Sequence, residues 1–320
     1  MSQAGDRPAI LVTGGNSGIG LECSRRLARE GVPLWLASRD EALSAEVAAG
    51  LAAETGNAAI GALALDLGSL ADVRRCAAEI DSRGLRLSGL VLNAGLQAND
   101  GPHHSADGYE RTFAVNHLGH FLLANLLLRN IAKHAPARIL VVASGVHDPA
   151  LSTGMPKPDI PDFASLASHG GPRDGFNGRL AYVNSKLCNV WFTYELIRRI
   201  ATAGLDATPL SVHGFEPGLV PGTGLAREYA PPLLFLWNHV PEWLARRIPM
   251  MNTAADAGVA LAERVLDPEL ERVSGRYFPS HTGFEAAPSS EESYDEARAA
   301  ELWALSVRLT ELTAADSPLA

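Results

Sequence analysis

A tyrosine and a lysine, Tyr182 and Lys186, lie four positions apart in a segment with a helical pattern. On a helix, side chains at this spacing share one face about one turn apart. An ammonium group about 4 Å from a phenol, in an effective dielectric of about 20, contributes roughly 4 kcal/mol and lowers the phenol pKa by about three units. Such a phenol can give a proton to a carbonyl oxygen as hydride arrives, or take it back. The pair therefore predicts acid–base chemistry coupled to hydride transfer.

Ser144 is the third polar residue of this predicted centre. It follows the apolar run Ile139–Ala143, which is typical of a strand buried between two helix layers. A hydroxyl at the end of such a strand can hydrogen-bond to an oxygen on which charge develops. We therefore expect Ser144 to orient the substrate oxygen that Tyr182 protonates.

A glycine-rich turn joins the first predicted strand, Ala9–Val12, to the following helix. The spacing is G-x-x-x-G-x-G, which differs from the general G-x-G-x-x-G fingerprint, and no Lys-Ser/Thr follows as a P-loop requires. Glycines at this position let a diphosphate approach backbone N–H groups and the positive end of a helix. The alternative is a purely structural turn. The predicted dinucleotide cradle comprises Gly14, Asn16, Ser17, Gly18, Ile19 and Gly20.

The second predicted strand, Leu34–Ala37, ends where an NAD-specific protein places a carboxylate for the ribose 2′-hydroxyl. This chain has Ser38 and Arg39 there instead, and the planar, permanently charged guanidinium fork suits a 2′-phosphate. Asp40 is better placed to cap the next helix. We therefore expect NADP(H), with an ion pair from Arg39 to Asp40 or Glu41 as the alternative.

Short apolar runs alternate with longer helical patterns through the first 215 residues, which predicts a Rossmann-type doubly wound α/β fold with a parallel sheet. The expected strands are Ala9–Val12, Leu34–Ala37, Ala58–Leu65, Gly89–Leu92, Ile139–Ala143 and Leu210–Phe215, with a candidate seventh at Gly275–Phe278. The expected helices are Gly18–Glu30, Glu41–Glu54, Leu70–Ser82, Tyr109–His134 and Arg179–Ala203. We predict one domain over residues 1–320, with a docking helix at about 295–312.

The order of these motifs resembles the short-chain dehydrogenase/reductase superfamily. The glycine turn, Asn93-Ala94-Gly95, Ser144 and the Tyr182-x-x-x-Lys186 pair carry the resemblance, which spans essentially the whole chain. It implies that Asn116, a polar residue in an apolar helical run, completes a proton-relay tetrad, and that Lys186 also binds the nicotinamide ribose. A hydrogen-bonded asparagine of the core, without a catalytic role, is the alternative for Asn116.

The same resemblance implies further cofactor contacts. Asn93 would stabilise the central sheet while the adjoining backbone passes the cofactor, and Asp66 would contact the adenine; a helix cap is the alternative for Asp66. The expected cofactor-binding residues beyond the glycine turn are Ser38, Arg39, Asp66, Leu67, Asn93, Ala94, Gly95, Tyr182, Lys186, Pro217, Gly218, Val220 and Thr223.

Far more residues separate Ser144 from Tyr182 than in typical members, which indicates an insertion on the substrate side. With the runs 115–121, 143–147 and 300–306, this insertion resembles the branch of retinol dehydrogenases and light-dependent protochlorophyllide reductases. The loop at 217–227 is similar to that of the protochlorophyllide reductases. Leu219 stands where those photoenzymes carry a cysteine proton donor, so a light-driven reaction is not expected.

Two irregular stretches, at about 145–178 and 217–250, follow strands and are expected to form a substrate lid. The second contains many large apolar residues between 229 and 244. Ordinary packing, a dimer contact and a membrane-surface helix are the alternatives for this apolar segment.

The composition excludes several classes of protein. The formal net charge is −9, which argues against nonspecific binding to nucleic acid. Three widely separated cysteines indicate neither a disulfide framework nor structural zinc, and His117 and His120 at i, i+3 lack a third ligand, so packing is favoured over a metal. We find no signal peptide and no apolar run long enough for a spanning helix, which favours a cytoplasmic protein and leaves homo-oligomerisation open.

These observations predict an NADPH-dependent oxidoreductase that reduces a carbonyl of a bulky hydrophobic, aromatic or polyketide-like small molecule to the alcohol. Oxidation of a retinol-like alcohol and reduction of a C=C bond are the enzymatic alternatives. The alternative from another class is a regulator that senses NADP on the same scaffold. The fold alone does not decide between them.

Overall fold

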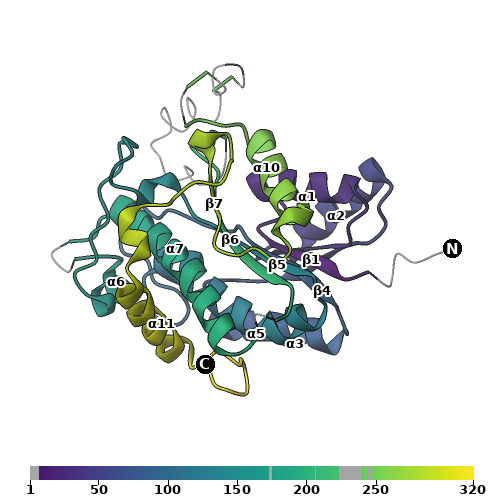
Figure 1. The fold of residues 1–320 in the computed structure, drawn as a ribbon. Coiled ribbons are helices and arrows are strands. Elements are labelled where there is room, and N and C mark those ends of the chain that lie inside the picture. Colours follow the sequence, from purple (N-terminus) through teal and green to yellow (C-terminus); the bar gives the residue numbers. More distant parts are fainter. Residues whose placement is uncertain are drawn as a thin grey trace.

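Seven parallel strands form a single sheet in the computed structural model, which describes residues 7–172, 175–205, 207–222, 240–241, 243, 247–248 and 250–320 (Figure 1). The strands are β1 (Ala9–Thr13), β2 (Leu34–Ser38), β3 (Ile60–Ala64), β4 (Leu87–Leu92), β5 (Ala137–Val142), β6 (Leu210–Glu216) and β7 (Tyr277–Pro279). Their order is β3-β2-β1-β4-β5-β6-β7. The order therefore reverses between β1 and β4, where ligands bind in sheets of this kind.

Helices cover both faces of the sheet, as Figure 1 shows. One layer consists of α1 (Gly18–Arg29), α2 (Glu41–Thr55) and α10 (Ala254–Leu266). The other contains α3 (Leu70–Ser82), α5 (Gly119–Lys133) and α7 (Gly178–Thr202), with α11 (Glu296–Thr310) packed against α7. The short helices α4 (Arg111–Phe113) and α6 (Phe163–His169) complete the α-helical segments of the described residues. This arrangement confirms the predicted doubly wound α/β fold.

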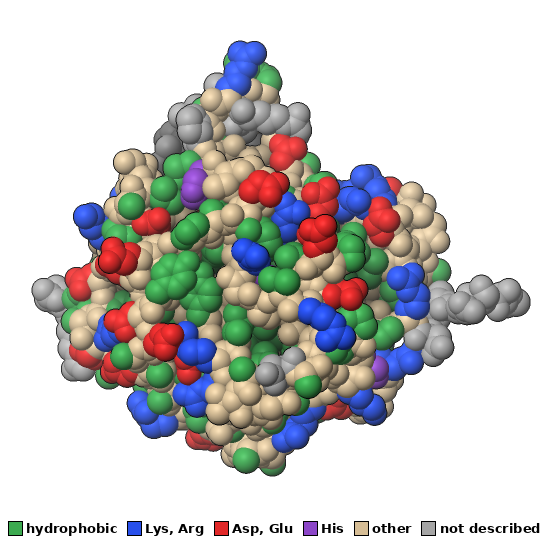
Figure 2. Space-filling model, in the orientation of Figure 1, with side chains coloured by type: hydrophobic (Ala, Val, Ile, Leu, Met, Phe, Trp, Pro, Cys, Tyr) green, Lys and Arg blue, Asp and Glu red, His purple; other side chains and the backbone are tan. Residues whose placement is uncertain are grey.

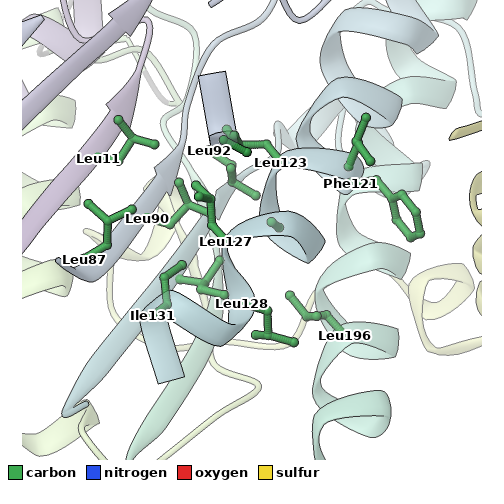
Figure 3. Packing of buried hydrophobic residues seen from close by; sticks show 14 of the residues in the cluster. Leu11, Leu87, Leu90, Leu92, Phe121, Leu123, Leu127, Leu128, Ile131 and Leu196 are labelled. Carbon is green, nitrogen blue, oxygen red and sulfur yellow. The ribbon is translucent and has the colours of Figure 1, made fainter. Parts of the chain in front are cut away.

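The side chains of the central strands alternate between the two helix layers. Leu11 of β1 packs with Leu90 and Leu92 of β4 in the cluster that includes α5 and α7 (Figure 3). Ile10 and Val12 belong to the opposite cluster with α1 and α10. Because both faces of the strands are buried, the runs are continuously apolar, and this is why they could be located from the sequence.

Helix caps set where the loops at the carboxyl edge of the sheet end and the following helices begin. Asp40 caps α2 by accepting the Leu43 N–H at 2.9 Å, as the sequence predicts. Asn177 caps α7 by accepting the N–H groups of Arg179 and Leu180, each at 3.1 Å. The helix that carries Tyr182 and Lys186 therefore starts at a defined residue.

Several predicted bounds differ from the structure by one or two residues, and two helices were missed. The helix expected over 109–134 begins at Arg111 and contains a π-helical turn, η1 (Ala114–Leu118), before α5. The strand expected over 58–65 is shorter, at Ile60–Ala64. Helix α10 and helix α6, which lies inside the stretch read as irregular, were not predicted. Helix α10 approaches α1 so closely at Gly258 that a methyl group there would lie 2.4 Å from the Glu22 Cβ.

On the face shown in Figure 2, basic side chains are interspersed with acidic ones rather than gathered in one patch. None of the helices in the described part of the chain combines the length and the apolar character needed to span a membrane.

Candidate active site

A cavity of about 480 Å³ opens at the carboxyl ends of the central strands. Residues from the glycine turn, the end of β2, the segment after β4, the end of β5, helix α7 and the loop after β6 line it. Its lining includes these predicted site residues: Gly14, Asn16, Ser17, Gly18, Ile19, Ser38, Arg39, Asp66, Leu67, Asn93, Ala94, Gly95, Ser144, Tyr182, Lys186, Pro217, Gly218 and Val220. Gly20 and Asn116 lie behind the lining, and Thr223 is outside the described residues.

The glycine turn has a backbone that only glycine readily adopts. Gly14 and Gly18 have φ angles of +64° and +54°, in the left-handed region. Gly20 has a different role, because a methyl group there would lie 2.2 Å from the Gly14 carbonyl oxygen and 2.6 Å from Asn93 Nδ2. The three glycines thus hold the backbone close to the start of α1, and this geometry fits a bound diphosphate.

The end of β2 leaves one cation at the cavity rim. Asn16 Nδ2 donates to Ser38 Oγ at 2.9 Å, and Ser38 Oγ donates in turn to the Asp40 carbonyl at 3.0 Å. Arg39 is exposed, and among the described residues it forms no ion pair with Asp40, Glu41 or any other acid. Its guanidinium is therefore available to a ligand in the cavity.

Thr13, at the end of β1, connects β1 to the segment after β4; the strand order reverses between these two strands. Its Oγ1 accepts the backbone N–H groups of Asn93 at 2.9 Å and Ala94 at 3.0 Å. Asn93 Nδ2 returns a hydrogen bond to the Thr13 carbonyl at 2.9 Å. The segment Asn93–Gly95 is thereby fixed beside the glycine turn. Sequence reasoning missed Thr13, because its position in a buried strand carries no chemical signal.

Asp66 does not cap helix α3, whose N-terminus is capped by Ser69. Its Oδ1 accepts the Gly68 N–H at 2.9 Å in a local turn, and the residue lines the cavity. The structure therefore removes the helix-cap alternative for Asp66, while a contact with adenine stays a prediction.

Tyr182 and Lys186 lie on one face of α7, as their spacing predicts. Lys186 Nζ is 5.6 Å from the centre of the Tyr182 ring and donates to the Val142 carbonyl at 3.2 Å. Lys186 is 4% exposed, and burial lowers its pKa from 10.5 to about 8, because removal from water disfavours the ammonium form. Ser144, at the end of β5, lines the same cavity. A proton donor, a cation and a hydroxyl therefore share one space.

Asn116 supports this centre from behind the cavity wall. It lies in the π-helical turn η1, and such turns are frequent at functional sites. Its side chain accepts the Leu96 N–H at 2.8 Å and donates to the Leu96 carbonyl at 2.9 Å and to Ser185 Oγ at 3.0 Å. Asn116 therefore ties the segment after β4 to helix α7, one residue from Lys186.

The loop after β6 depends on a buried carboxylate, Glu216, which sequence reasoning also missed. Its oxygens accept the Gly218 N–H at 2.6 Å and the Ser280 N–H at 2.8 Å. Gly218 has a φ of +79°, and a methyl group there would lie 2.6 Å from Asn252 Nδ2. Glu216 thus holds the backbone that lines the cavity at 217–220.

The insertion at 145–178 has two different parts. Its first part reaches the cavity, where Met155 packs beside Val146, Tyr182 and Val183. Its second part contains α6, whose Phe163 and Leu166 are buried against α7 and α11. Among the residues of the insertion that the structure describes, those that line the cavity belong to this first part. Of the apolar segment 229–244, most lies outside the described residues; Trp243 is 61% exposed.

The remaining sulfur and imidazole groups do not form a metal centre in the described ranges, where no group of three or more His, Cys, Asp or Glu side chains could hold a metal ion. The three cysteines are buried free thiols. His117 and His120 are both buried and hydrogen-bonded to other parts of the chain, to Ser306 and Thr13 respectively.

Comparison with known proteins agrees with this geometry. The family model described as short chain dehydrogenase matches residues 8–153. Human retinol dehydrogenase 14 is 36% identical over 93% of this chain and 84% of its own length. The chain belongs to the short-chain dehydrogenase/reductase family. A chloroplastic protochlorophyllide reductase from Chlamydomonas reinhardtii is 34% identical over 96% of this chain and 79% of its own.

These relatives place this short-chain dehydrogenase/reductase in the predicted branch of retinol dehydrogenases and protochlorophyllide reductases. Its family membership identifies it as an oxidoreductase. The fold also matches a solved structure, the Pseudomonas aeruginosa RhlG/NADP active-site complex, with a TM-score of 0.63 and 24% identity over 87% of this chain and 96% of that one. At this identity the likeness concerns the fold alone.

Proposed function

We propose that this protein is an NADPH-dependent reductase that converts a carbonyl group of a bulky hydrophobic substrate, aromatic or polyketide-like, to the alcohol. The observation that carries the proposal is one cavity lined both by the glycine turn and Arg39 and by Ser144, Tyr182 and Lys186. The cofactor-binding and the proton-transferring groups thus meet in a single space.

The mechanism follows from the placement of these side chains. The nicotinamide, when bound, supplies a hydride to the carbonyl carbon. The Ser144 hydroxyl donates a hydrogen bond to the substrate oxygen, and the Tyr182 hydroxyl gives that oxygen its proton. Lys186, held by the Val142 carbonyl, keeps a positive charge beside the phenol and thereby favours loss of the phenol proton. Asn116 maintains the position of helix α7 relative to the segment after β4.

Arg39 supports the choice of NADPH. It is an exposed cation at the end of β2 without an acidic partner among the described residues, and its fork geometry matches a phosphate. A carboxylate, which would bind the 2′-hydroxyl of NADH, is instead committed to the cap of α2 as Asp40.

The cavity wall near Tyr182 supports an apolar substrate. Val146 and Met155 pack beside Tyr182, and Leu96 and Leu219 also line the cavity, with Gln97 as a polar residue among them. Cavities of this kind bind ligands mainly by apolar contact, with a few polar groups that set orientation.

The retinol dehydrogenase relatives favour a second candidate, oxidation of a retinol-like alcohol, which uses the same groups in the reverse direction. The protochlorophyllide reductase relative raises reduction of a C=C bond as a third. Ser144 suits a substrate oxygen, however, and Leu219 offers no acidic proton, so carbonyl chemistry is favoured over C=C reduction.

The test combines binding and turnover. NADPH and NADH are titrated separately by fluorescence, and NADPH oxidation is then followed with a panel of polycyclic aromatic ketones, with retinol and NADP+ as the reverse assay. We expect Tyr182→Phe to abolish turnover and to leave NADPH binding unchanged. Tyr194→Phe is the matched control, because Tyr194 lies on the same helix and bonds to Ser289 rather than lining the cavity.

Each outcome separates the alternatives. Equal turnover by wild type and Tyr182→Phe would refute the mechanism. NADPH binding without turnover of any ketone or alcohol would favour the NADP-sensing regulator. If the protein binds neither NADPH nor NADH, the proposal that it is a nicotinamide-dependent enzyme is refuted.

A further inference from the structure

Two buried histidines, His117 and His120, lie within one turn of each other at the π-helical turn and have different neighbours. His117 stacks on Phe113, with ring centres 5.3 Å apart, and its Nε2 lies 2.9 Å from Ser306 Oγ of α11. His120 points to the other side, toward the end of β1. The mechanism described above uses neither of them.

The hydrogen bonds of His120 define its protonation and tautomer. Nδ1 lies 3.1 Å from the Asn116 carbonyl oxygen, which can only accept, so Nδ1 carries a proton. Burial lowers the pKa of His120 to about 4, so the ring is neutral and Nε2 is an acceptor. Thr13 Oγ1 lies 2.9 Å from Nε2 and 3.2 Å from the Val91 carbonyl oxygen, so its single proton is shared between these two acceptors.

Both partners of His120 belong to the centre described above. Thr13 Oγ1 accepts the N–H groups of Asn93 and Ala94, which line the cavity. The Asn116 side chain joins Leu96 to Ser185 on helix α7. His120 therefore closes a ring of hydrogen bonds from the end of β1, through the segment after β4, to the turn that carries Asn116.

The contact of His120 with Thr13 is the distinctive one. A helical histidine often bonds to a carbonyl one turn earlier, and His134 at the end of α5 does so with the Asn130 carbonyl at 2.9 Å, away from the cavity. The second contact, from Nε2 to a strand hydroxyl, is what links the helix to the sheet. His120 is also close enough to Lys186 for the ammonium charge to disfavour its protonation.

We propose that His120 is a positioning residue for the reaction: its neutral ring holds the π-helical turn, and with it Asn116, against the end of β1. Helix α7 and the segment after β4 then keep the relative position that proton transfer from Tyr182 requires. This inference rests on the proposed carbonyl reduction. It concerns the placement of side chains and adds no chemical step of its own.

The test compares His120→Phe with His117→Phe. Each change keeps an aromatic side chain of similar shape and removes the hydrogen bonds of a buried imidazole. We expect His120→Phe to lower kcat about tenfold or more, since small misplacements of reacting groups cost this much, and to change the Kd for NADPH much less. His117→Phe keeps the wild-type kcat. His120→Gln, which retains one donor and one acceptor, recovers most of the lost rate.

A second measurement needs neither cofactor nor turnover. Nitrogen-15 NMR of the ligand-free, histidine-labelled wild-type protein should show His120 as the neutral Nδ1–H tautomer from pH 8 down to about pH 5, given its low pKa. Detection of the Nε2–H tautomer would overturn the proposal, even if the variants fold poorly.

The failure of this inference differs from the failure of the proposed function. If wild type reduces ketones, Tyr182→Phe does not, and His120→Phe matches His117→Phe in kcat, only the role of His120 is refuted. If His120→Gln is as slow as His120→Phe, retention of the hydrogen bonds does not matter and the role is refuted as well. If wild type turns over no carbonyl substrate, the proposed function fails first, while the tautomer still tests the geometry.

Discussion

Replacing Lys186 with methionine should make the ligand-free protein more stable while it abolishes catalysis. The ammonium group is buried, and among the described residues it has no carboxylate partner at hydrogen-bond or ion-pair distance. Its pKa falls from 10.5 to about 8 in the folded protein because burial disfavours the charge. Folding therefore competes with protonation at this one side chain.

The sign and size of the effect follow from this shift. A base whose pKa is lowered by folding destabilises the folded state at pH values below the folded pKa, about 8, and this cost disappears as the pH rises toward 10.5. Each unit corresponds to about 1.4 kcal/mol, so the cost at pH 7 is about 3 kcal/mol. The lost hydrogen bond offsets about 1 kcal/mol of the gain. The Val142 carbonyl keeps its bond from Asn189 Nδ2 at 3.2 Å, so no acceptor is left unpaired.

Guanidinium unfolding of the ligand-free Lys186→Met variant and wild type, at pH 7 and again near pH 10, measures this difference. We expect the variant to be more stable by about 2 kcal/mol at pH 7 and the gain to shrink near pH 10. Packing changes are independent of pH and cancel in the comparison between the two pH values. Lys157→Met, at an exposed lysine, is the control and should show no such dependence. A variant that is less stable than wild type at pH 7, or a gain that does not change with pH, would refute the reasoning.

Three further changes test other parts of the site. Arg39→Gln should raise the Kd for NADPH about tenfold or more and leave that for NADH unchanged, as measured by fluorescence titration, because one charge-assisted phosphate contact is lost. Gly20→Ala should abolish binding of both cofactors, since the added methyl group would lie 2.2 Å from the Gly14 carbonyl oxygen; wild-type binding would contradict the close approach. Glu216→Gln should lower stability by about 1–3 kcal/mol in guanidinium unfolding and weaken NADPH binding, because an amide cannot accept at both oxygens of the former carboxylate; unchanged stability would show that the fold does not need both contacts, to Gly218 and to Ser280.

The sequence was most informative where one local rule governs the structure. Strands buried on both faces are continuously apolar, so β1, β2 and β5 could be located to within a residue or two. The i, i+4 spacing on a helix brought Tyr182 and Lys186 to one face without any knowledge of the rest of the fold. The carboxyl-edge rule for parallel sheets then brought Ser144 to the same cavity.

The sequence was least informative where a residue acts through a distant partner. Thr13, His120 and Glu216 look like ordinary members of a strand or an apolar helix, and their roles depend on neighbours 64 to 107 positions away. The π-helical turn has no pattern of its own, since its extra residue is absorbed within a continuous helical run. Helix α6 was read as loop because glycines and prolines dominate the stretch around it.

Gly20 shows how a residue can be chosen correctly as part of a motif and still have a different physical role. The motif suggests that each glycine faces the cofactor, but Gly20 packs against the Gly14 carbonyl and the Asn93 side chain from behind. It makes the turn tight enough for the other glycines to form the cavity wall. Only the backbone geometry separates these two roles.

The buried ionisable groups at the carboxyl edge of the sheet argue that this region is shaped by chemistry rather than by stability. A buried ammonium such as that of Lys186 costs free energy that an apolar side chain of similar volume would not. The buried Lys186 ammonium lowers the stability of the fold, but it places a positive charge beside the Tyr182 phenol, where little water screens it. The hydrogen bonds of Asn116 and His120 join the segments around this ammonium, namely the end of β1, the segment after β4 and helix α7, to one another.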